Sequence, residues 1–247
     1  MIRAMMSLAV ALGLVLAAPA SANPVLFTGD GDPLAAGLED INGPSQWAAD
    51  TPSPGFLMQG PGDDNGGYGL DDRPDRPGGP SGRATAELDP NKGYFVEWRV
   101  DVESSTDGPQ WPGFNIGVYF WIEDASGRNI IVNPIDPNSG TVFGHRNAWG
   151  AAATGSFEMG GGFHTLRLEH PGGGANTIDI YYDGALVGDN VAMGVGDGYA
   201  RVYAGNGGAL ASGEAVYDYY VINTEIPEPA SMALLATGAL CLLRRRR

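Results

Sequence analysis

The sequence predicts an all-β protein whose main domain is a two-layer antiparallel β-sandwich. From Ala84 onward, short segments alternate apolar and polar side chains, which is the period of a strand with one buried face. Turns rich in Gly and Asp separate these segments, and no stretch keeps the 3.6-residue period of an amphipathic helix. Short strands, frequent turns and no convincing helix together favour two packed sheets.

The alternation is clearest in YFVEWRVDVE, where the apolar residues expected to face the core are Val96, Trp98, Val100 and Val102. The next segment, NIGVYFWIE, places Tyr119 and Trp121 on the face opposite Phe120. Further strands are expected in RNIIVN, FHTLRLEH, NTIDIYY, ALV, ARVYAG and EAVYDYYVIN. Asp183-Gly184 supplies a two-residue hairpin turn between two of them.

The first part of the domain differs in composition. Residues 28–83 are rich in Gly, Pro and Asp, and only short strands such as PVLF and GFLMQ are expected near and within them. We expect long surface loops here, with disorder of residues 72–83 as the alternative. The domain as a whole is placed at residues 23–226.

Residues 1–22 have the three parts of a secretory signal peptide. Arg3 provides a positive start, the stretch from Met5 to Ala18 is almost wholly apolar, and Ala20-Ser21-Ala22 is a small-residue cleavage site. We expect cleavage after Ala22 and export of the protein.

The chain ends with Pro227, Glu228 and Pro229, an apolar run over residues 230–243, and four arginines. This run is shorter than the roughly 20 residues that cross a bilayer unaided, although the arginines extend its reach and stay on the cytoplasmic side. The segment 227–247 resembles the PEP-CTERM sorting signal. That resemblance implies a transient stay in the inner membrane of a Gram-negative bacterium and processing by an exosortase near the Pro-Glu-Pro. A permanent transmembrane anchor is the alternative.

The formal net charge is −15, although Arg3 and the four terminal arginines are among the 14 basic residues. The domain between the two terminal signals is therefore strongly acidic. This charge argues against nucleic acid or anionic lipid as a partner, and it is compatible with calcium binding. The single cysteine, Cys241, lies in the tail, so the domain cannot form a disulfide.

The order of strands from Phe95 to Asn223 resembles the concanavalin A-like lectin/glucanase jelly roll. The resemblance is carried by YFVEWRVDV, NIGVYFWI, FHTLRLEH, IDIYYDGALV and VYAGNGGALASGEAVYDYYVIN. It implies a sandwich fold but no single function, because the family includes glycan-binding modules, polysaccharide hydrolases and lyases, and adhesive modules.

Catalysis on a glycan usually needs two carboxylates roughly 5 to 9 Å apart. The weak candidates are Glu97, Asp101 and Glu103, which share one strand face. The compact Glu-x-Asp-x-(x)-Glu strand motif of the related β-glucanases is missing, and Arg99 among these acids is typical of a solvated, self-neutralising face. The three histidines lack the spacing of metal ligands and are expected to be packed or turn residues.

Binding has better candidates, because sugar rings stack on Trp and Tyr while their hydroxyls bond to polar side chains. The candidate ligand-binding residues are Tyr119, Trp121, Tyr199, Arg201 and Tyr203. If their strands share a sheet, they form an aromatic and polar groove. The alternative is that the rings only cover the second face of a sheet.

The jelly-roll resemblance also implies a structural calcium ion that ties the start of the domain to an Asp near its end. Asp218 is the best candidate for a calcium ligand, with Asp30 and Asp32 as its partners. Ordinary turn chemistry of these Asp residues is the alternative.

We therefore predict an exported protein of the cell surface or extracellular matrix that binds a polysaccharide without cleaving it. A polysaccharide hydrolase or lyase is the first alternative. A structural adhesion protein that binds another protein is the second.

Overall fold

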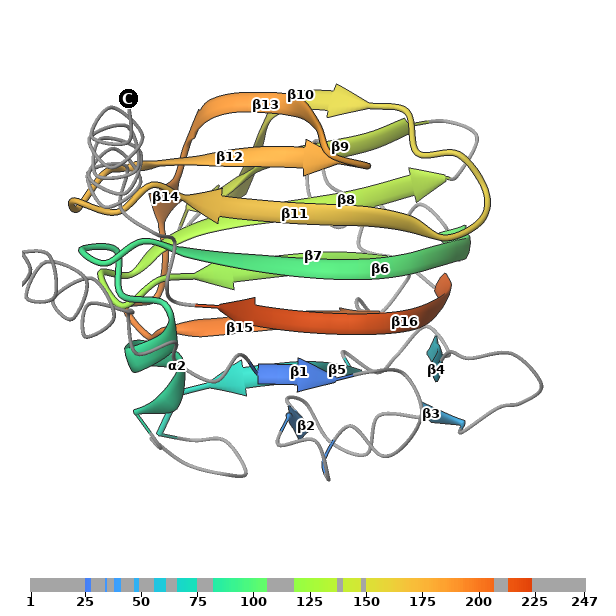
Figure 1. The fold of residues 1–247 in the computed structure, drawn as a ribbon, viewed down its shortest axis with the longest axis horizontal. Helices are drawn as coiled ribbons and strands as arrows, with labels where there is room; N and C mark the ends of the chain where they lie inside the picture. Colours follow the sequence, from blue (N-terminus) through green and yellow to red (C-terminus); the bar gives the residue numbers. More distant parts are fainter. Residues whose placement is uncertain are drawn as a thin grey trace, which may run out of the picture.

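A computed structural model describes residues 25–27, 34, 38–40, 47–48, 56–60, 66–74, 82–105, 118–136, 140–147, 150–206 and 213–223. This part of the chain forms two antiparallel sheets that lie face to face (Figure 1). The predicted two-layer β-sandwich is confirmed.

Sheet A, the nearer one in Figure 1, has the strand order β13 (Ala185–Ala192), β12 (Thr177–Tyr182), β11 (His164–His170), β6 (Tyr94–Ser105), β16 (Gly213–Asn223), β4 (Phe56–Gly60) and β3 (Trp47–Ala48), with β1 (Val25–Phe27) also paired to β16. Sheet B has the order β10 (Gly150–Phe157), β9 (Gly140–Asn147), β8 (Arg128–Asp136), β7 (Val118–Glu123), β15 (Arg201–Asn206), β5 (Gly66–Asp71) and β2 (Glu39–Asp40), with β14 (Gly194–Val195) paired to β8. The pairing of β1 with β16 joins the first and last strands of the described ranges.

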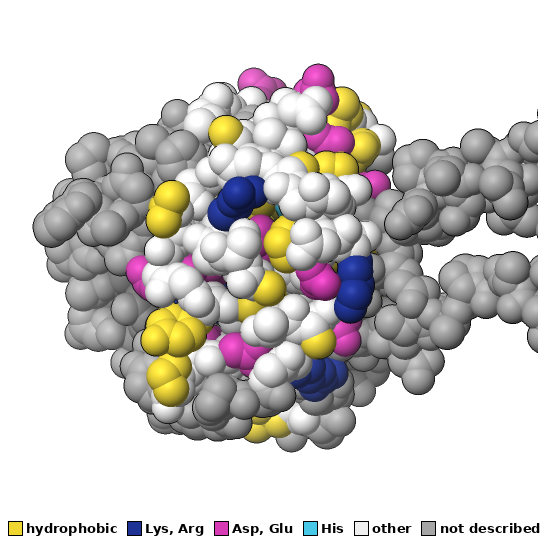
Figure 2. All heavy atoms as spheres, turned by 90° about the vertical axis from the view of Figure 1, so that its left-hand side faces the viewer, with side chains coloured by type: hydrophobic (Ala, Val, Ile, Leu, Met, Phe, Trp, Pro, Cys, Tyr) yellow, Lys and Arg dark blue, Asp and Glu magenta, His cyan; other side chains and the backbone are white. Residues whose placement is uncertain are grey.

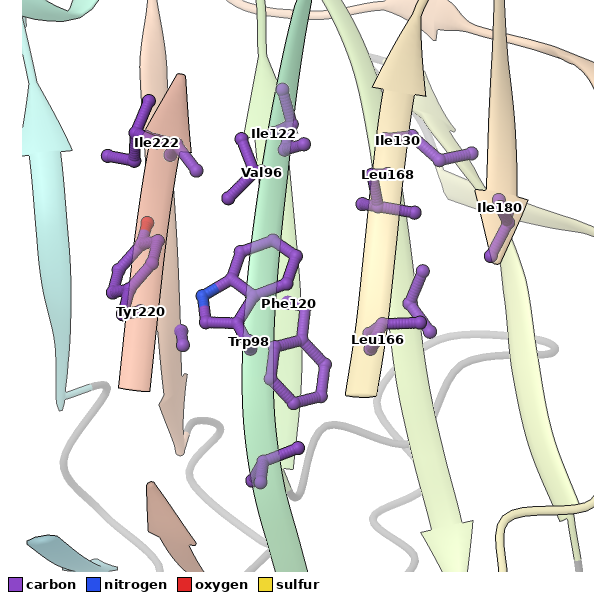
Figure 3. Close-up of a cluster of buried hydrophobic side chains, with 14 of the residues drawn as sticks. Val96, Trp98, Phe120, Ile122, Ile130, Leu166, Leu168, Ile180, Tyr220 and Ile222 are labelled. Carbon is purple, nitrogen blue, oxygen red and sulfur yellow. The ribbon is translucent and has the colours of Figure 1, made fainter. Parts of the chain in front are cut away.

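The inward faces of the two sheets form one hydrophobic core. On β6, the expected residues Val96, Trp98, Val100 and Val102 are all buried, which confirms the register predicted for this strand. The Trp98 ring lies 5.0 Å from that of Phe120 on β7, so it bridges the two sheets (Figure 3). Burial of each large apolar side chain stabilises the folded state by roughly 1.5–3 kcal/mol. The burial of these alternating residues is therefore the main reason that this face of β6 points inward.

The predicted hairpin between β12 and β13 is also confirmed. Asp183 and Gly184 both adopt positive φ, 47° and 77°. Two successive residues of this kind form the tight turn whose twist matches the twist of the flanking strands. Because the turn has only two residues, Tyr182 at the end of β12 lies directly opposite Ala185 at the start of β13. The outer face of β12 is part of the sheet surface.

Several strands were not predicted from the sequence, because their residues show no alternation of apolar and polar side chains. The sequence of β5 is GGYGLD, which reads as a loop, and that of β10 is GAAATGSF, which has no alternation. A Cβ at Gly69 would lie 1.8 Å from the backbone oxygen of Val202, so glycine is required there by the close approach of β15. These glycines therefore belong to a packed strand rather than to a loop.

The expectation of no helix was wrong in one place. Helix α2 (Arg83–Glu87) is a single turn in which the Leu88 N–H is bonded to the Ala84 oxygen. Next to it, Asp72 accepts a 2.7 Å hydrogen bond from the Thr85 N–H. Within the stretch 72–83, the structure describes residues 72–74 and 82–83, and this bond joins the first of these two pieces to the helix that follows the second. Residues 75–81 lie outside the described ranges.

Within the described ranges, no helix is long and apolar enough to cross a membrane. The expected signal peptide and the apolar run at residues 230–243 both lie outside those ranges, so the structure lends no support to a transmembrane helix in the tail.

Candidate functional site

The structure brings most of the predicted ligand-binding residues together on the outer face of sheet B. Strands β7 and β15 are neighbours, and Trp121 lies directly opposite Tyr203. Their rings stack with centroids 5.7 Å apart, and the Tyr119 ring meets Tyr203 edge-on at 5.4 Å. The Arg201 guanidinium lies 4.5 Å from the Trp121 ring centroid. The sequence therefore identified a real cluster of side chains.

This cluster is closed to solvent. The exposed fractions of Tyr119, Trp121, Arg201 and Tyr203 are 5%, 8%, 2% and 5%, whereas Tyr199 is 43% exposed. A sugar can stack only on an accessible ring face. The aromatic groove expected on this face is therefore not open in this structure, and a ligand-binding role for these residues stays a prediction.

A buried ion-pair network explains why Arg201 is held on this face. It donates to Glu123 at 2.6 Å and to Asp197 at 2.8 Å, and Glu123 also accepts the Gly198 N–H at 2.7 Å. Burial alone disfavours the charged guanidinium, but Tyr203, Glu123 and Asp197 hold the pKa of Arg201 above its ordinary value. The network keeps the charges of this closed face compensated.

An open concavity lies instead on the outer face of sheet A, which is turned toward the viewer in Figure 1. We call it the Arg167 hollow. It has a volume of about 580 Å³ and is lined by Glu97, Thr165, Arg167, Glu169, Tyr181, Asp183 and Gly184. Strand register builds it, because Arg167 on β11 lies opposite Glu97 on β6 and opposite Tyr181 on β12.

Arg167 is fixed by three neighbours. Its Nε and Nη2 atoms donate to one oxygen of Glu169 at 3.0 and 2.7 Å. Its Nη1 atom lies 3.7 Å from Glu97, and its guanidinium carbon lies 3.7 Å from the Phe95 ring centroid. A planar cation held on a ring between two carboxylates is a rigid element of the hollow floor.

The carboxylates of the hollow are also ordered. Glu97 accepts a 2.8 Å hydrogen bond from the Tyr219 hydroxyl. Asp183 accepts the Thr165 N–H at 2.9 Å and lies 2.7 Å from His164 Nδ1. Partial burial alone would raise the pKa of Asp183, but these two hydrogen-bond partners hold it below its usual value. Asp183 is therefore an ionised acceptor at neutral pH.

The other catalytic candidates lie further along β6. Asp101 accepts the Gly162 N–H at 3.1 Å. Glu103 is exposed, and desolvation, followed by the negative charges of Glu214 and Asp101, raises its pKa. Arg99 pairs with Asp218 across β6 and β16, which agrees with the self-neutralising face expected here.

That ion pair bears on the calcium prediction. The Asp218 carboxylate is held by the Arg99 guanidinium, and its role as a calcium ligand stays a prediction. Among the residues that the structure describes, no three His, Cys, Asp or Glu side chains are grouped to hold a metal ion. Asp30 and Asp32 lie outside the described ranges.

The side chains of two of the three histidines are described, and both have structural partners. His164 pairs with Asp183 at the hairpin turn, and His170 is buried with its ring 4.9 Å from that of Tyr94. The side chain of His145 is outside the described part. For His164 and His170, the expectation of packed or turn residues is confirmed.

Charge on the end of the sandwich seen in Figure 2 is mixed. Basic side chains of the described residues stand singly among acidic and apolar ones. On this end of the molecule, the described residues offer no continuous basic surface of the kind that nucleic acid needs.

Sequence reasoning missed the central residues of the hollow. Arg167 and Tyr181 occupy polar positions of two correctly predicted strands, FHTLRLEH and NTIDIYY. The alternation showed that both side chains point outward, but their positions opposite each other depend on strand pairing.

The family model of the PEP-CTERM protein-sorting motif matches residues 225–247. The predicted sorting signal is thus confirmed, and it indicates an exported protein that an exosortase processes at the membrane. The chain has no significant match among curated proteins.

Solved structures with a similar fold include a carbohydrate esterase from the Shiga toxin-encoding bacteriophage phi24B. The TM-score is 0.52 at 13% identity, covering 83% of this chain and 99% of that one. The carbohydrate binding module CBM66 from Bacillus subtilis has a TM-score of 0.39 at 15% identity, covering 76% of this chain and 92% of the module. The binding domain of botulinum neurotoxin DC in complex with rat synaptotagmin II has a TM-score of 0.43 at 12% identity, with 80% of this chain and 45% of the toxin chain covered.

This chain thus spans less than half of the toxin chain. At such identities the similarity to the esterase shows the fold alone. The two-layer β-sandwich expected from the sequence agrees with this similarity of fold.

Proposed function

We propose that this chain is an exported protein of the cell surface or extracellular matrix that binds a polysaccharide through the Arg167 hollow without cleaving it. The observation that carries the proposal is the hollow itself, an open concavity with a tyrosine and a fixed arginine among ordered carboxylates. Its volume of about 580 Å³ lies within the roughly 300–1,000 Å³ of small-ligand sites. Tyr181 offers a ring for stacking, and the carboxylates accept bonds from sugar hydroxyls.

The carboxylates of the hollow suit recognition better than hydrolysis. Glu169 is bound to Arg167, Glu97 accepts from Tyr219, and Asp183 is held ionised by its partners. A general acid in glycoside hydrolysis must stay protonated near neutral pH, which requires a raised pKa. The pKa of Asp183 is instead lowered by its hydrogen-bond partners.

One observation favours hydrolysis as a second candidate function. The pKa of Glu103 is raised by desolvation and by the negative charges of Glu214 and Asp101, and a general acid needs a raised pKa. A glycan screen separates the two functions if it scores both retention and the release of reducing ends. If the parent chain releases reducing ends and Glu103→Gln abolishes that release, hydrolysis replaces binding as the proposed function.

For the binding test, the full chain is purified in a non-glycosidic detergent and screened against immobilised polysaccharides. We expect retention by at least one polysaccharide and a loss of about tenfold on Tyr181→Ala, because one lost stacking contact is worth about that factor. The control is Val195→Ala, which truncates an exposed apolar side chain on β14 of sheet B, away from the hollow. No retention on any glycan, with capture of a protein of the matrix instead, would favour the adhesion alternative.

The proposal includes removal of the tail. In a host with the sorting enzyme, the mature protein should lose everything after about Pro229, and Glu228→Ala should leave it in the inner membrane. Intact-mass measurement of the surface-extracted protein checks this. A mass that still includes Cys241 and the arginines would show a permanent anchor.

A further inference from the structure

The charges that line the Arg167 hollow do not balance. Three carboxylates, those of Glu97, Glu169 and Asp183, face one guanidinium. His164 adds an imidazole beside Asp183, and the neighbouring Arg99 is engaged by Asp218. The described lining is therefore acidic even after its internal ion pairs are formed.

Arg167 is not available to receive an anionic ligand. Its Nε and Nη2 atoms are directed to Glu169, its Nη1 side faces Glu97, and one face of the guanidinium is covered by Phe95. A ligand carboxylate would have to displace Glu169 and would then meet the remaining acids at close range. Like charges in such a setting weaken binding.

The acidic surroundings extend to the tyrosine that offers the stacking surface. Burial raises the pKa of the Tyr181 hydroxyl, and Asp179, Glu169 and Asp189 raise it further against the opposing effect of Arg167. Three carboxylates and one guanidinium therefore lie near enough to act on this ring. Asp179 itself accepts the Asn190 N–H at 2.8 Å, which keeps its carboxylate on this face of β12.

We infer that the Arg167 hollow takes an amine-bearing sugar, a hexosamine unit without its acetyl group. This inference rests on the proposed function and specifies its ligand. The sugar ring stacks on Tyr181 while its ammonium group lies against the carboxylates of Glu169 and Glu97. Hydroxyls of the same ring donate to Asp183. Uronic acids and sulfated sugars are rejected, because they bring a negative charge into an acidic hollow.

The test uses three disaccharide probes with the full chain at physiological salt. They are the disaccharide of glucosamine, its N-acetylated counterpart and digalacturonate. Short probes and salt suppress general attraction between an acidic protein and a cationic polymer. We expect the glucosamine disaccharide to bind about tenfold more tightly than the acetylated one, since two exposed ion pairs contribute about that factor, and digalacturonate not to bind.

The variants decide whether the preference comes from the hollow. Glu169→Gln should abolish the preference for the amine, whereas Glu87→Gln on helix α2, which makes the same change of charge away from sheet A, should keep it. Glu97→Gln serves as a second variant if Glu169→Gln lowers the thermal midpoint.

Equal or tighter binding of the acetylated probe would overturn the inference but leave glycan binding intact. A preference that survives both Glu169→Gln and Glu97→Gln would also overturn it, because the attraction would then be general. If none of the three probes binds while polysaccharides are retained, the inference fails alone. If nothing binds, the proposed function fails with it.

Discussion

The outer faces of the two sheets carry the same kind of arrangement in two different environments. On sheet B, Arg201 lies over the Trp121 ring and pairs with a carboxylate, and all three groups are buried. On sheet A, Arg167 lies over the Phe95 ring and pairs with a carboxylate, with its side chain 30% exposed. The same arrangement of guanidinium, ring and carboxylate therefore stabilises a closed face on sheet B and lines an open hollow on sheet A. The two roles differ because the group on sheet B is buried and that on sheet A is partly exposed.

The largest expected effect comes from removing the two arginines in turn. Arg201→Met leaves the buried Glu123 without its partner, so we expect a loss of about 3–5 kcal/mol in the free energy of unfolding. Arg167→Met removes a partly exposed ion pair and should cost about 1 kcal/mol or less. Urea unfolding of both variants measures the difference. Equal losses would mean that the two faces are not distinguished by burial.

A smaller effect is expected from the two aromatic residues that the two faces offer to a ligand. Trp121→Ala removes a buried ring and should cost about 3 kcal/mol, whereas Tyr181→Ala should cost about 1 kcal/mol or less. Glycan retention should follow the opposite order, with the loss on Tyr181→Ala. Retention that is lost on Trp121→Ala in folded protein, but kept on Tyr181→Ala, would place the binding site on sheet B as the sequence had suggested.

The smallest effect on stability is expected from the two histidines of β11. His170 is buried, accepts the Gly172 N–H at Nδ1, and bonds to the Ala175 oxygen through Nε2. Burial lowers the pKa of His170, against the opposing effects of the Ala175 carbonyl and Asp124; Arg128 lowers it further. The unfolded chain therefore takes up a proton first as the pH falls below about 6.5, and the stability contributed by neutral His170 is lost below that pH.

This loss is measurable as a fall of the thermal midpoint between about pH 7 and pH 5. His170→Asn should flatten that slope, and His164→Asn at the open end of the same strand is the control. A slope that is unchanged by His170→Asn but removed by His164→Asn would show that the hairpin end, rather than the buried end, responds to acid.

The sequence predicted the fold in those places where one face of a strand meets the core. The period in β6 and the Asp-Gly turn between β12 and β13 are local signals, and both were correct. Strands β5 and β10 were missed, because glycine and alanine carry no period and Gly69 is required by the backbone of a strand far away in the chain. The candidate site was only partly predicted: Glu97 was named as a catalytic candidate, and the structure places it in the lining of the hollow, where it accepts from Tyr219.

The sequence by itself determined which residues of each regular strand point inward, and it identified the sorting motif at the C-terminus, because side-chain alternation and the motif are properties of neighbouring residues. It also showed that aromatic and charged side chains lie on the outer faces. Only the tertiary structure decided which of those faces is open. Glu97, Arg167 and Tyr181 meet through pairing of strands that are distant in sequence, and the exposure of a side chain depends on everything that packs over it.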